Sequence, residues 1–433
     1  MIALNKHQRA KLRIIRDKQQ KAQHRMAKYQ HSDNFDKVMY MQHYLDALQK
    51  CRVGVGWKGS VQLYTQNAIT EISKTLTKLS NNELPKLTSI KRITLYERGK
   101  KRNIIPITIK DRMIQRVLCD YALIPVLKDK LIYDNGASMK DKGVDFTRKR
   151  IDKHIHEAIR EYGSDFYALT FDFKSFFNSI PHETCLRVLK ENFTDRRIIG
   201  IVMAIIKSYQ ETEIMAIKNK AERNRQLTLL RNNKLSGICL GSQISQIMAL
   251  VVPNLLDHYI KDKVGVKHYV RYMDDGIILS NDKQFLHNIY SGMVEISKEL
   301  GLSFNEKKTQ IVKMSKGITF MKIRYIVTPS GKLVKKLHKS GIIRMRRKLK
   351  KFRRLVNLGL ITLDDVYNSF QSWVAHSYLA QSYRTRKNMI KLYNDLFDGY
   401  RITRKYNHVK GGKNGELLQA DKWNKYRWNC NVA

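Results

Sequence analysis

The chain has 433 residues and carries 82 Lys and Arg against 38 Asp and Glu, which gives a formal net charge of +44. Because 42% of its residues are hydrophobic, it can bury a core, and disorder from low hydrophobicity is excluded for most of its length. A compact body this basic repels itself, so a polyanion such as nucleic acid is the expected partner. The alternatives are a ribosome-associated protein, a membrane-surface protein and a surface charged only for solubility.

Export and membrane insertion are not expected. The chain has no run of about 18 apolar residues, and Lys6 and Arg9 come before any signal-peptide core could form. The cysteines are far apart and form no C-x-x-C pair, so we expect a reducing, cytoplasmic setting and no zinc knuckle. They are Cys51, Cys119, Cys185, Cys239 and Cys430.

The first part of the chain is predicted to be helical and basic. Lys6–Lys28 carries nine basic residues and one acidic residue, and Phe35–Leu48 has apolar residues at helical spacing. Residues 1–90 therefore form a predicted basic arm, which either holds a structured RNA or packs as a helix on the rest of the protein. A strand, a turn and a second strand are expected around Tyr96–Arg102, followed by a long helix over Asp111–Ile132.

The middle of the chain alternates short apolar runs with helices. Asp165–Asp172 is apolar, rich in aromatic residues and ends in a carboxylate, which predicts a buried strand. Gln243–Ile260 has the apolar period of a buried helix. Lys267–Ser280 consists of two apolar runs interrupted by Asp274 and Asp275, which predicts a hairpin with acidic residues at its tip.

The last third of the chain becomes strongly basic. A helix is expected over Lys283–Leu300, and a pair of strands follows around Ile311 and Phe320. Residues 331–354 hold twelve Lys and Arg and no acid, with apolar residues at helical spacing. We expect a helix there that packs with one side and faces phosphates with the other.

Three carboxylates are the strongest indication of chemistry. Asp172 ends one predicted strand, and Asp274 and Asp275 lie at the tip of the predicted hairpin. Buried carboxylates without a cationic partner are strongly destabilising. Two Mg²⁺ ions about 4 Å apart, or Mn²⁺ in their place, would neutralise them and stabilise both oxygens of an in-line phosphoryl transfer. The alternative for Asp274 and Asp275 is an ordinary solvated turn pair.

These residues resemble the reverse transcriptases, and among them the bacterial enzymes of group II introns, diversity-generating retroelements and anti-phage defence systems. Phe171–His182 resembles the first catalytic palm motif, and Tyr272–Asp275 matches the Y-x-D-D box. The resemblance covers about residues 91–330. It implies an α+β right-hand polymerase fold with fingers, a palm built from an antiparallel sheet and helices, and a helical thumb.

The resemblance also implies a division of the chain into units. In chain order these are a basic helical N-terminal arm (1–90), fingers (91–165), a palm that also contains part of the fingers (166–330), a helical thumb (331–397) and a basic C-terminal extension (398–433). The thumb is expected to close on the heteroduplex and to recognise it by its backbone shape.

The catalytic roles follow from the same resemblance. It implies that Asp172 and Asp274 bind both metal ions, with Asp275 in support and the Phe173 carbonyl as a further candidate ligand. Phe177 corresponds to the steric gate, where a bulky ring excludes a 2′-hydroxyl. Deoxynucleotides are therefore the predicted substrates.

Further positions correspond to contacts with the nucleotide, primer and template. Arg102 and Lys110 resemble the fingers residues that clamp the triphosphate, since guanidinium and ammonium groups both suit phosphate; the alternative is solvated surface charge. Lys308 matches the lysine that protonates the departing pyrophosphate. The expected nucleotide contacts are Arg102, Lys110, Phe173, Phe177, Leu240 and Gly241. The expected primer and template contacts are Tyr272, Met273, Gln243, Ser245 and Gln246.

The segment Leu240–Gln246 departs from the usual Q-G-x-x-x-S-P motif at both ends. Leu240 stands where a glutamine contacts the sugar of the incoming nucleotide, and Gln246 replaces the proline. Both changes resemble the diversity-generating branch and some defence branches. Losing one polar contact lowers discrimination by about 1 kcal/mol, so reduced fidelity is our hypothesis. Core packing of Leu240 is the alternative.

The sequence therefore predicts an RNA-directed DNA polymerase that copies a specific RNA in a bacterial or phage retroelement or an anti-phage defence system. An RNA-binding maturase or chaperone on a polymerase scaffold and an RNA-directed RNA polymerase are the alternatives. The expected partners are a template or non-coding RNA, the cDNA/RNA heteroduplex and dNTPs, together with an accessory protein or a second copy of the chain.

Overall fold

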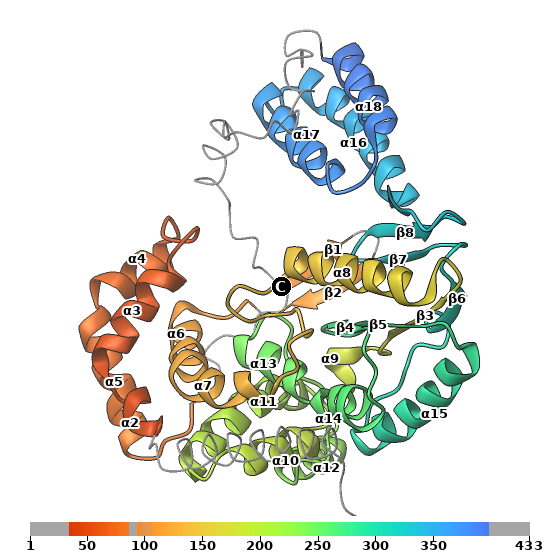
Figure 1. The fold of residues 1–433 in the computed structure, drawn as a ribbon. Helices are drawn as coiled ribbons and strands as arrows, with labels where there is room; N and C mark the ends of the chain where they lie inside the picture. The colour runs from red at the N-terminus through yellow and green to blue at the C-terminus, as the bar shows by residue number, and fades with distance from the viewer. Residues whose placement is uncertain (1–33, 86–92, 98–99, 105, 398–433) are drawn as a thin grey trace, which may run out of the picture.

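The computed structural model describes residues 34–85, 93–97, 100–104 and 106–397 (Figure 1). The basic stretch Lys6–Lys28 and the C-terminal extension 398–433 lie outside the described residues. Among the described residues, no helix combines the length and the apolar character needed to cross a bilayer.

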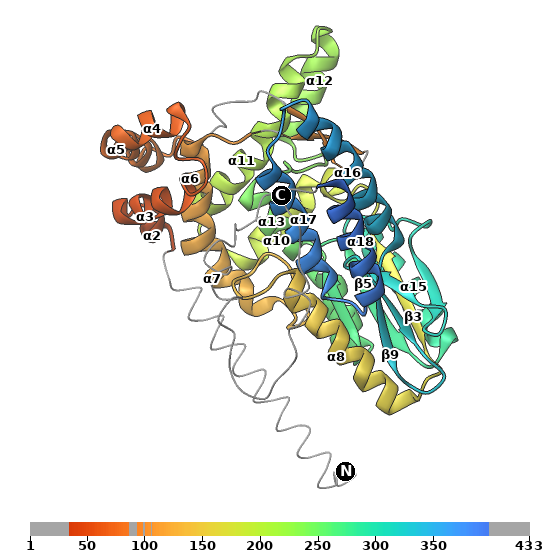
Figure 2. The same cartoon turned by 90° about the horizontal axis from the view of Figure 1, so that it is seen from above.

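The described part of the predicted arm packs into the main core of the protein. Its helices are α2 (Asn34–Val38), α3 (Met41–Cys51), α4 (Gly59–Gln66) and α5 (Ala68–Ser80). Helices α3 and α4 contact α6 (Ile109–Val117), and the side chains of Tyr44 and Ile72 are buried in the same core as α6. Figure 2 shows α2–α5 along one side of the molecule, opposite the central sheet.

The strand pair predicted around Tyr96–Arg102 is present as an antiparallel pair of β1 (Ile93–Glu97) and β2 (Lys100–Ile104). The long helix predicted after it is a series of shorter helical segments. After α6 these are a π-helical turn η1 (Leu118–Leu123), α7 (Ile124–Leu127) and a 3₁₀ turn η2 (Lys128–Lys130).

A four-stranded antiparallel sheet in the order β4–β5–β3–β6 forms the centre of the fold. Its strands are β3 (Tyr167–Asp172), β4 (Tyr269–Tyr272), β5 (Asp275–Ser280) and β6 (Gln310–Lys313). Successive side chains point to opposite faces: Leu169 and Ile278 belong to the main core, whereas Ala168 and Ile277 belong to a second core beneath α8 (Val144–Tyr162). Both faces of the sheet are therefore buried.

Helices cover the two faces of this sheet unequally. In Figure 1, α8 lies above the sheet, and a larger group of helices lies below it. That group consists of α9 (Phe176–Ser179), α10 (His182–Asn192), α11 (Arg196–Met215), α12 (Lys220–Arg231), α13 (Gln243–Val251), α14 (Asn254–His258), the π-helical turn η3 (Tyr259–Lys263) and α15 (Lys283–Glu299).

A second sheet leads to three C-terminal helices. It is antiparallel, in the order β7 (Ile318–Phe320), β8 (Ile323–Val327) and β9 (Leu333–Leu337). The helices α16 (Lys339–Asn357), α17 (Leu363–Ser377) and α18 (Tyr383–Leu396) enclose a small core of their own (Figure 1). All eight Lys and Arg residues from Arg344 to Arg354 are exposed, while Met345 and Leu349 are buried, so α16 has the packed side and the basic side that its pattern predicted.

Three expectations from the sequence were wrong. The helix predicted over Gln243–Ile260 is divided into α13 and α14 around Pro253, whose ring nitrogen cannot donate a helical hydrogen bond. The strands at Ile311 and Phe320 do not pair with each other, because β6 pairs with β3 and β7 pairs with β8. The start of the segment 331–354 forms β9 rather than helix.

Candidate active site

Two antiparallel strand ends bring the three predicted carboxylates together. Asp172 is the last residue of β3 and lies opposite Asp275, the first residue of β5. Asp274 lies in the two-residue turn between β4 and β5, where Met273 takes the positive φ of +53° that such a turn requires. One carboxylate oxygen of each aspartate lies within 4.8 Å of the other two. Tyr272 and Met273 immediately precede Asp274, so they adjoin the triad.

A fully buried arginine holds the turn. Arg271 in β4 forms a two-pronged ion pair with Asp257 of α14, with Nε and Nη2 at 2.7 and 2.6 Å from the two carboxylate oxygens. Its Nη1 donates to the Met273 carbonyl at 2.8 Å, and its Nη2 also donates to the Leu250 carbonyl at 2.9 Å. The Tyr269 hydroxyl donates to Asp257 at 2.7 Å. These hydrogen bonds compensate for removing two charges from water, and they tie the β4–β5 hairpin to α13 and α14.

Aromatic rings pack around the strand ends that carry the triad. The ring of Phe171 lies against Gly276, where an added Cβ would come within 2.1 Å of the ring. Phe173 is buried between Phe176 and Phe304, with ring centroids 5.2 and 4.9 Å away. The Asn305 N–H donates to the carbonyl of Asp172 at 2.7 Å, which fixes the end of β3.

The triad concentrates negative charge in a partly buried place. Burial and the neighbouring Asp274 raise the pKa of Asp275 to about 8. Burial and Asp172 raise the pKa of Asp274. Lys308 Nζ lies 2.7 Å from Asp172 Oδ2, and this contact raises the pKa of the lysine. Three carboxylates this close ionise together only beside more positive charge than one lysine supplies, and carboxylate oxygens suit Mg²⁺ or Mn²⁺. The residues present thus fit a divalent cation.

Residues 85–325, more than half of the chain, match the family model described as reverse transcriptase (RNA-dependent DNA polymerase). The chain belongs to the reverse transcriptase family. It therefore carries the domain of an RNA-directed DNA polymerase, which is a nucleotidyltransferase. The antiparallel central sheet with its covering helices agrees with the expected right-hand polymerase fold.

Two solved telomerase structures have a low similarity to this chain. Apo telomerase from Candida tropicalis, truncated from the C-terminal domain, is 14% identical, with a TM-score of 0.40 over 64% of this chain and 60% of that chain. Telomerase from Candida albicans in complex with a TWJ fragment of telomeric RNA is 15% identical, with a TM-score of 0.41 over 80% of this chain and 61% of that chain. The reverse transcriptase chain thus covers about three fifths of both telomerase chains. No curated protein sequence matches it at a significant level.

The segment Leu240–Gln246, which differs from the usual Q-G-x-x-x-S-P motif, forms the turn before α13 and the first turn of that helix. Gly241 has φ +101°, and the hydroxyl of Ser242 accepts a hydrogen bond from the N–H of Ser245 at 3.2 Å, which caps the helix. Leu240, Gln243 and Gln246 are half-buried, whereas Ser245 is 2% exposed and faces the protein.

Two aromatic positions of the predicted nucleotide site differ in exposure. Phe173 is 2% exposed, so only its backbone could face a nucleotide; its N–H donates to the Asp274 carbonyl at 3.3 Å. Phe177 is half-buried, and its carbonyl accepts a hydrogen bond from the Ile238 N–H at 2.8 Å. The backbone around Phe177 is thereby held beside the turn that leads to α13.

The predicted triphosphate contacts, Lys110 and Arg102, lie on different elements. Lys110, at the start of α6, lies 3.6 Å from Glu71 of α5, so its ammonium already has a carboxylate partner. Arg102 lies in β2, opposite Leu95. The roles of both residues remain predictions.

Two positioning interactions were missed at the sequence level. One is the pair of Arg271 and Asp257, and its signal was a charged residue inside the apolar run Tyr269–Tyr272. The other is Gln115 of α6, whose side-chain carbonyl accepts hydrogen bonds from the Ser242 hydroxyl at 2.8 Å and from the Gln243 N–H at 3.1 Å. Gln115 had no local signal, because its partners lie more than 120 residues away.

Proposed function

We propose that this reverse transcriptase copies an RNA template into cDNA by two-metal nucleotidyl transfer. The observation that carries the proposal is the convergence of Asp172, Asp274 and Asp275 at adjoining strand ends. These carboxylates would hold the divalent cations, which when bound stabilise the charge on the attacking and leaving oxygens. A scaffold that only bound RNA would gain nothing from three carboxylates whose mutual repulsion destabilises the fold.

The neighbouring residues have distinct tasks in this proposal. Arg271 fixes the backbone that presents Asp274, through its bond to the Met273 carbonyl. Lys308 holds a proton at Nζ beside Asp172, and 53% of its side chain is exposed, so it is available to protonate a departing pyrophosphate. The Phe173 carbonyl is a further candidate metal ligand, and Tyr272 and Met273 are candidates to touch the primer end.

Substrate choice is assigned to two side chains. Phe177 is proposed as the steric gate, because its backbone is anchored and a bulky ring there would exclude a 2′-hydroxyl. Leu240 is proposed to weaken discrimination among nucleotides, because it cannot offer a hydrogen bond. Core packing is the weaker account of Leu240, since it is half-buried and is not among the described side chains that pack against the main core.

A fidelity measurement tests the assignment of Leu240. Leu240→Gln restores one polar contact worth about 1 kcal/mol, so the misincorporation frequency should fall about fivefold. Sequencing of cDNA made on a defined RNA by the wild type and the variant measures it. An unchanged error rate in Leu240→Gln at unchanged activity would refute the hypothesis that Leu240 lowers fidelity.

We further infer the division into fingers, palm and thumb given above, with the exposed basic residues of α16 on the duplex. Phosphate contacts through such residues need no sequence-reading geometry. The setting that we favour is a bacterial or phage retroelement or an anti-phage defence system, with a dedicated RNA as template. Sequencing the RNA and cDNA that copurify with the protein would identify that template.

Incubation of the full chain with a primed RNA and either dNTPs or NTPs separates the candidate functions. A reverse transcriptase extends the primer with dNTPs and discriminates against NTPs. Preferred incorporation of NTPs would favour an RNA-directed RNA polymerase. Binding of RNA without any extension, in Mg²⁺ and in Mn²⁺, would favour an RNA chaperone.

A further inference from the structure

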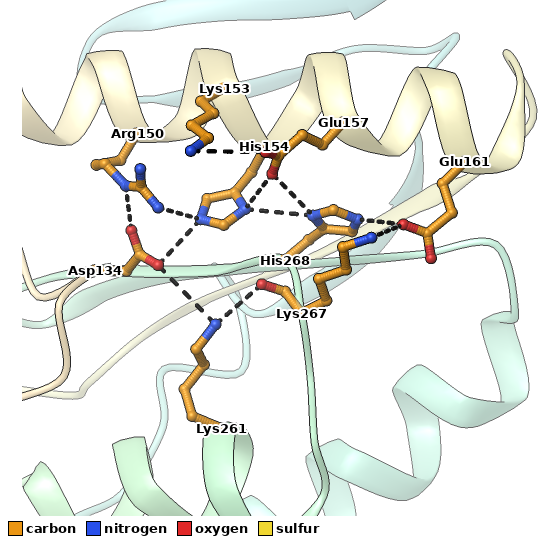
Figure 3. Close-up of polar contacts among 9 residues, drawn as sticks. All are labelled: Asp134, Arg150, Lys153, His154, Glu157, Glu161, Lys261, Lys267 and His268. Carbon is orange, nitrogen blue, oxygen red and sulfur yellow. Dashed lines mark hydrogen bonds and ion pairs between the residues drawn. The ribbon is translucent and has the colours of Figure 1, made fainter. Parts of the chain in front are cut away.

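A second cluster of potential metal ligands lies on the α8 side of the central sheet, apart from the catalytic carboxylates. His154 and Glu157 lie one helical turn apart on α8, and His268 directly precedes β4. His154 and His268 are 4% and 1% exposed, respectively. Figure 3 shows the two imidazole rings and the Glu157 carboxylate pointing toward one another between the helix and the strand.

The three converging atoms have the spacing of ligands around one metal ion. His154 Nδ1 lies 3.3 Å from His268 Nδ1, and the two nitrogens lie 3.6 and 4.0 Å from Glu157 Oε2. In a tetrahedral Zn²⁺ site with bonds of about 2.0–2.2 Å, two ligand atoms are about 3.3–3.6 Å apart. Two of the three observed separations match that range, and the third needs a movement of a few tenths of an ångström.

The outer nitrogens of the two rings each face a carboxylate. His154 Nε2 lies 3.2 Å from Asp134 Oδ2, and His268 Nε2 lies 3.4 Å from Glu161 Oε2. A carboxylate only accepts hydrogen bonds, so Asp134 favours a proton on His154 Nε2, whereas Arg150 Nη2, 3.4 Å from the same nitrogen, favours the other tautomer.

Three atoms that can donate an electron pair to a metal ion face one another at the centre of this cluster. In the metal-free protein, a proton on one Nδ1 joins the two rings through the 3.3 Å hydrogen bond, and Glu157 Oε2 lies beside this pair. A metal ion at the centre would displace that proton and bind the lone pairs of both Nδ1 atoms and of Glu157 Oε2. The carboxylate behind each histidine is also the usual outer support of a metal-bound imidazole, because it fixes the tautomer and the ring orientation.

The neighbouring charged side chains do not occupy the three inner atoms, which are His154 Nδ1, His268 Nδ1 and Glu157 Oε2. Arg150 donates to Asp134 through Nε, and its Nη2 lies 3.4 Å from the outer nitrogen of His154, Nε2. Lys267 pairs with Glu161, and Lys261 lies 4.0 Å from Asp134. Lys153 lies 3.8 Å from the other oxygen of Glu157, Oε1. The basic side chains thus pair with the outer carboxylates and with the outward oxygen, while the inward oxygen faces the histidines (Figure 3).

We propose that His154 Nδ1, His268 Nδ1 and Glu157 Oε2 bind one first-row divalent transition metal ion, for which Zn²⁺ is the natural probe. Two imidazoles and a carboxylate suit Zn²⁺ better than Mg²⁺, which prefers oxygen ligands. Because the Glu157 side chain is 26% exposed, a water molecule can reach the fourth position from that side.

The proposed site would link two elements of the palm. It would join α8 to the residue that precedes β4, and the other end of β4 leads into the turn that carries Asp274. The His268 carbonyl also accepts a hydrogen bond from the Leu279 N–H at 2.9 Å, so His268 already belongs to the sheet. The metal would therefore stabilise the catalytic hairpin without touching substrate.

Titration of the metal-stripped, full-length protein with Zn²⁺ tests this proposal. Excess Mg²⁺ is present throughout, so that it occupies the catalytic carboxylates, and calorimetry gives stoichiometry and affinity. We expect one Zn²⁺ per chain, binding at least about 100-fold more weakly in Glu157→Gln and His268→Gln. His156→Ala is the matched control, because this exposed histidine lies on the same helix. It should bind like the wild type.

Two further measurements keep the test decisive. With Co²⁺ in place of Zn²⁺, the wild type should show the visible absorption of tetrahedral coordination, and Glu157→Gln should not. Circular dichroism verifies that this variant is folded, which is expected because Glu157 is partly exposed. Asp134→Asn, behind His154, should weaken Zn²⁺ binding about 10–100-fold. Absence of Zn²⁺ binding, or equal affinity in the wild type and in folded Glu157→Gln, would overturn the proposal.

Discussion

Arg271→Met is the substitution that should most clearly separate the stability of the palm from its catalysis. It removes a guanidinium that is fully buried and leaves the Asp257 carboxylate, equally buried, without its cation. It also removes the donors to the carbonyls of Leu250 and Met273.

The expected loss of stability follows from the burial of the pair. Removing one partner of a buried ion pair costs about 3–5 kcal/mol, because the remaining charge stays out of water. For a chain of 433 residues the entropy of unfolding gives roughly 1 °C per kcal/mol, so Tm should fall by about 3–5 °C. The double variant Arg271→Met/Asp257→Leu removes both charges, and such a replacement is often neutral. It should regain most of the lost stability, and with it most of the lost Tm. About 1 kcal/mol stays lost, because the Tyr269 hydroxyl no longer has Asp257 as its acceptor.

Catalysis should not recover together with stability. The double variant still lacks the donor to the Met273 carbonyl, so the turn that presents Asp274 is less well fixed. A displacement of about 1 Å at a reacting centre can lower the rate about 100-fold. Thermal unfolding gives Tm, single-nucleotide extension gives the rate, and Arg160→Met on the exposed face of α8 is the control. Wild-type Tm in Arg271→Met, or the wild-type rate in the double variant, would refute the reasoning.

Three further predictions concern the triad and its surroundings. Gly276→Ala should destabilise by about 1–3 kcal/mol and slow extension, because its Cβ would overlap an aromatic ring; Gly59→Ala, with open space around it, should leave Tm unchanged or raised. Lys308→Ala should lower kcat at least about 100-fold with little change in KM, whereas the adjacent exposed Lys307→Ala should not. Without divalent cations, the raised pKa of Asp275 makes the folded protein bind its proton more tightly than the unfolded chain. Tm should therefore fall as pH rises from about 4 to 8, and Asp275→Asn should flatten this dependence.

The sequence was most informative where the signal was local. The aromatic run ending at Asp172 and the two apolar runs around Asp274 each had the length and period of a buried strand. The acids lay at their ends, so pairing of those strands was enough to assemble the triad. The basic and apolar sides of α16 could also be predicted, since its basic and apolar residues each recur at helical spacing.

Interactions between distant segments could not be predicted in this way. The partner of β6 is β3, about 140 residues earlier, rather than the next strand, so the expected local pair was wrong. Lys110 meets Glu71 where two helices pack, and Arg271 of β4 meets Asp257 of α14; no periodicity specifies either contact. The spacing of His154 and Glu157 placed them on one helical face, but only the fold brings His268 to that face.

The most direct test of the central claim is extension of a primed RNA by dNTPs with the variant Asp274→Ala/Asp275→Ala. Glu306→Gln, which removes an exposed carboxylate near Lys308 and outside the triad, is the matched control. We expect extension in the wild type and in the control, and none in the double variant, although its RNA binding and fold persist. Extension that survives the loss of both aspartates would contradict the assignment of catalysis to this site.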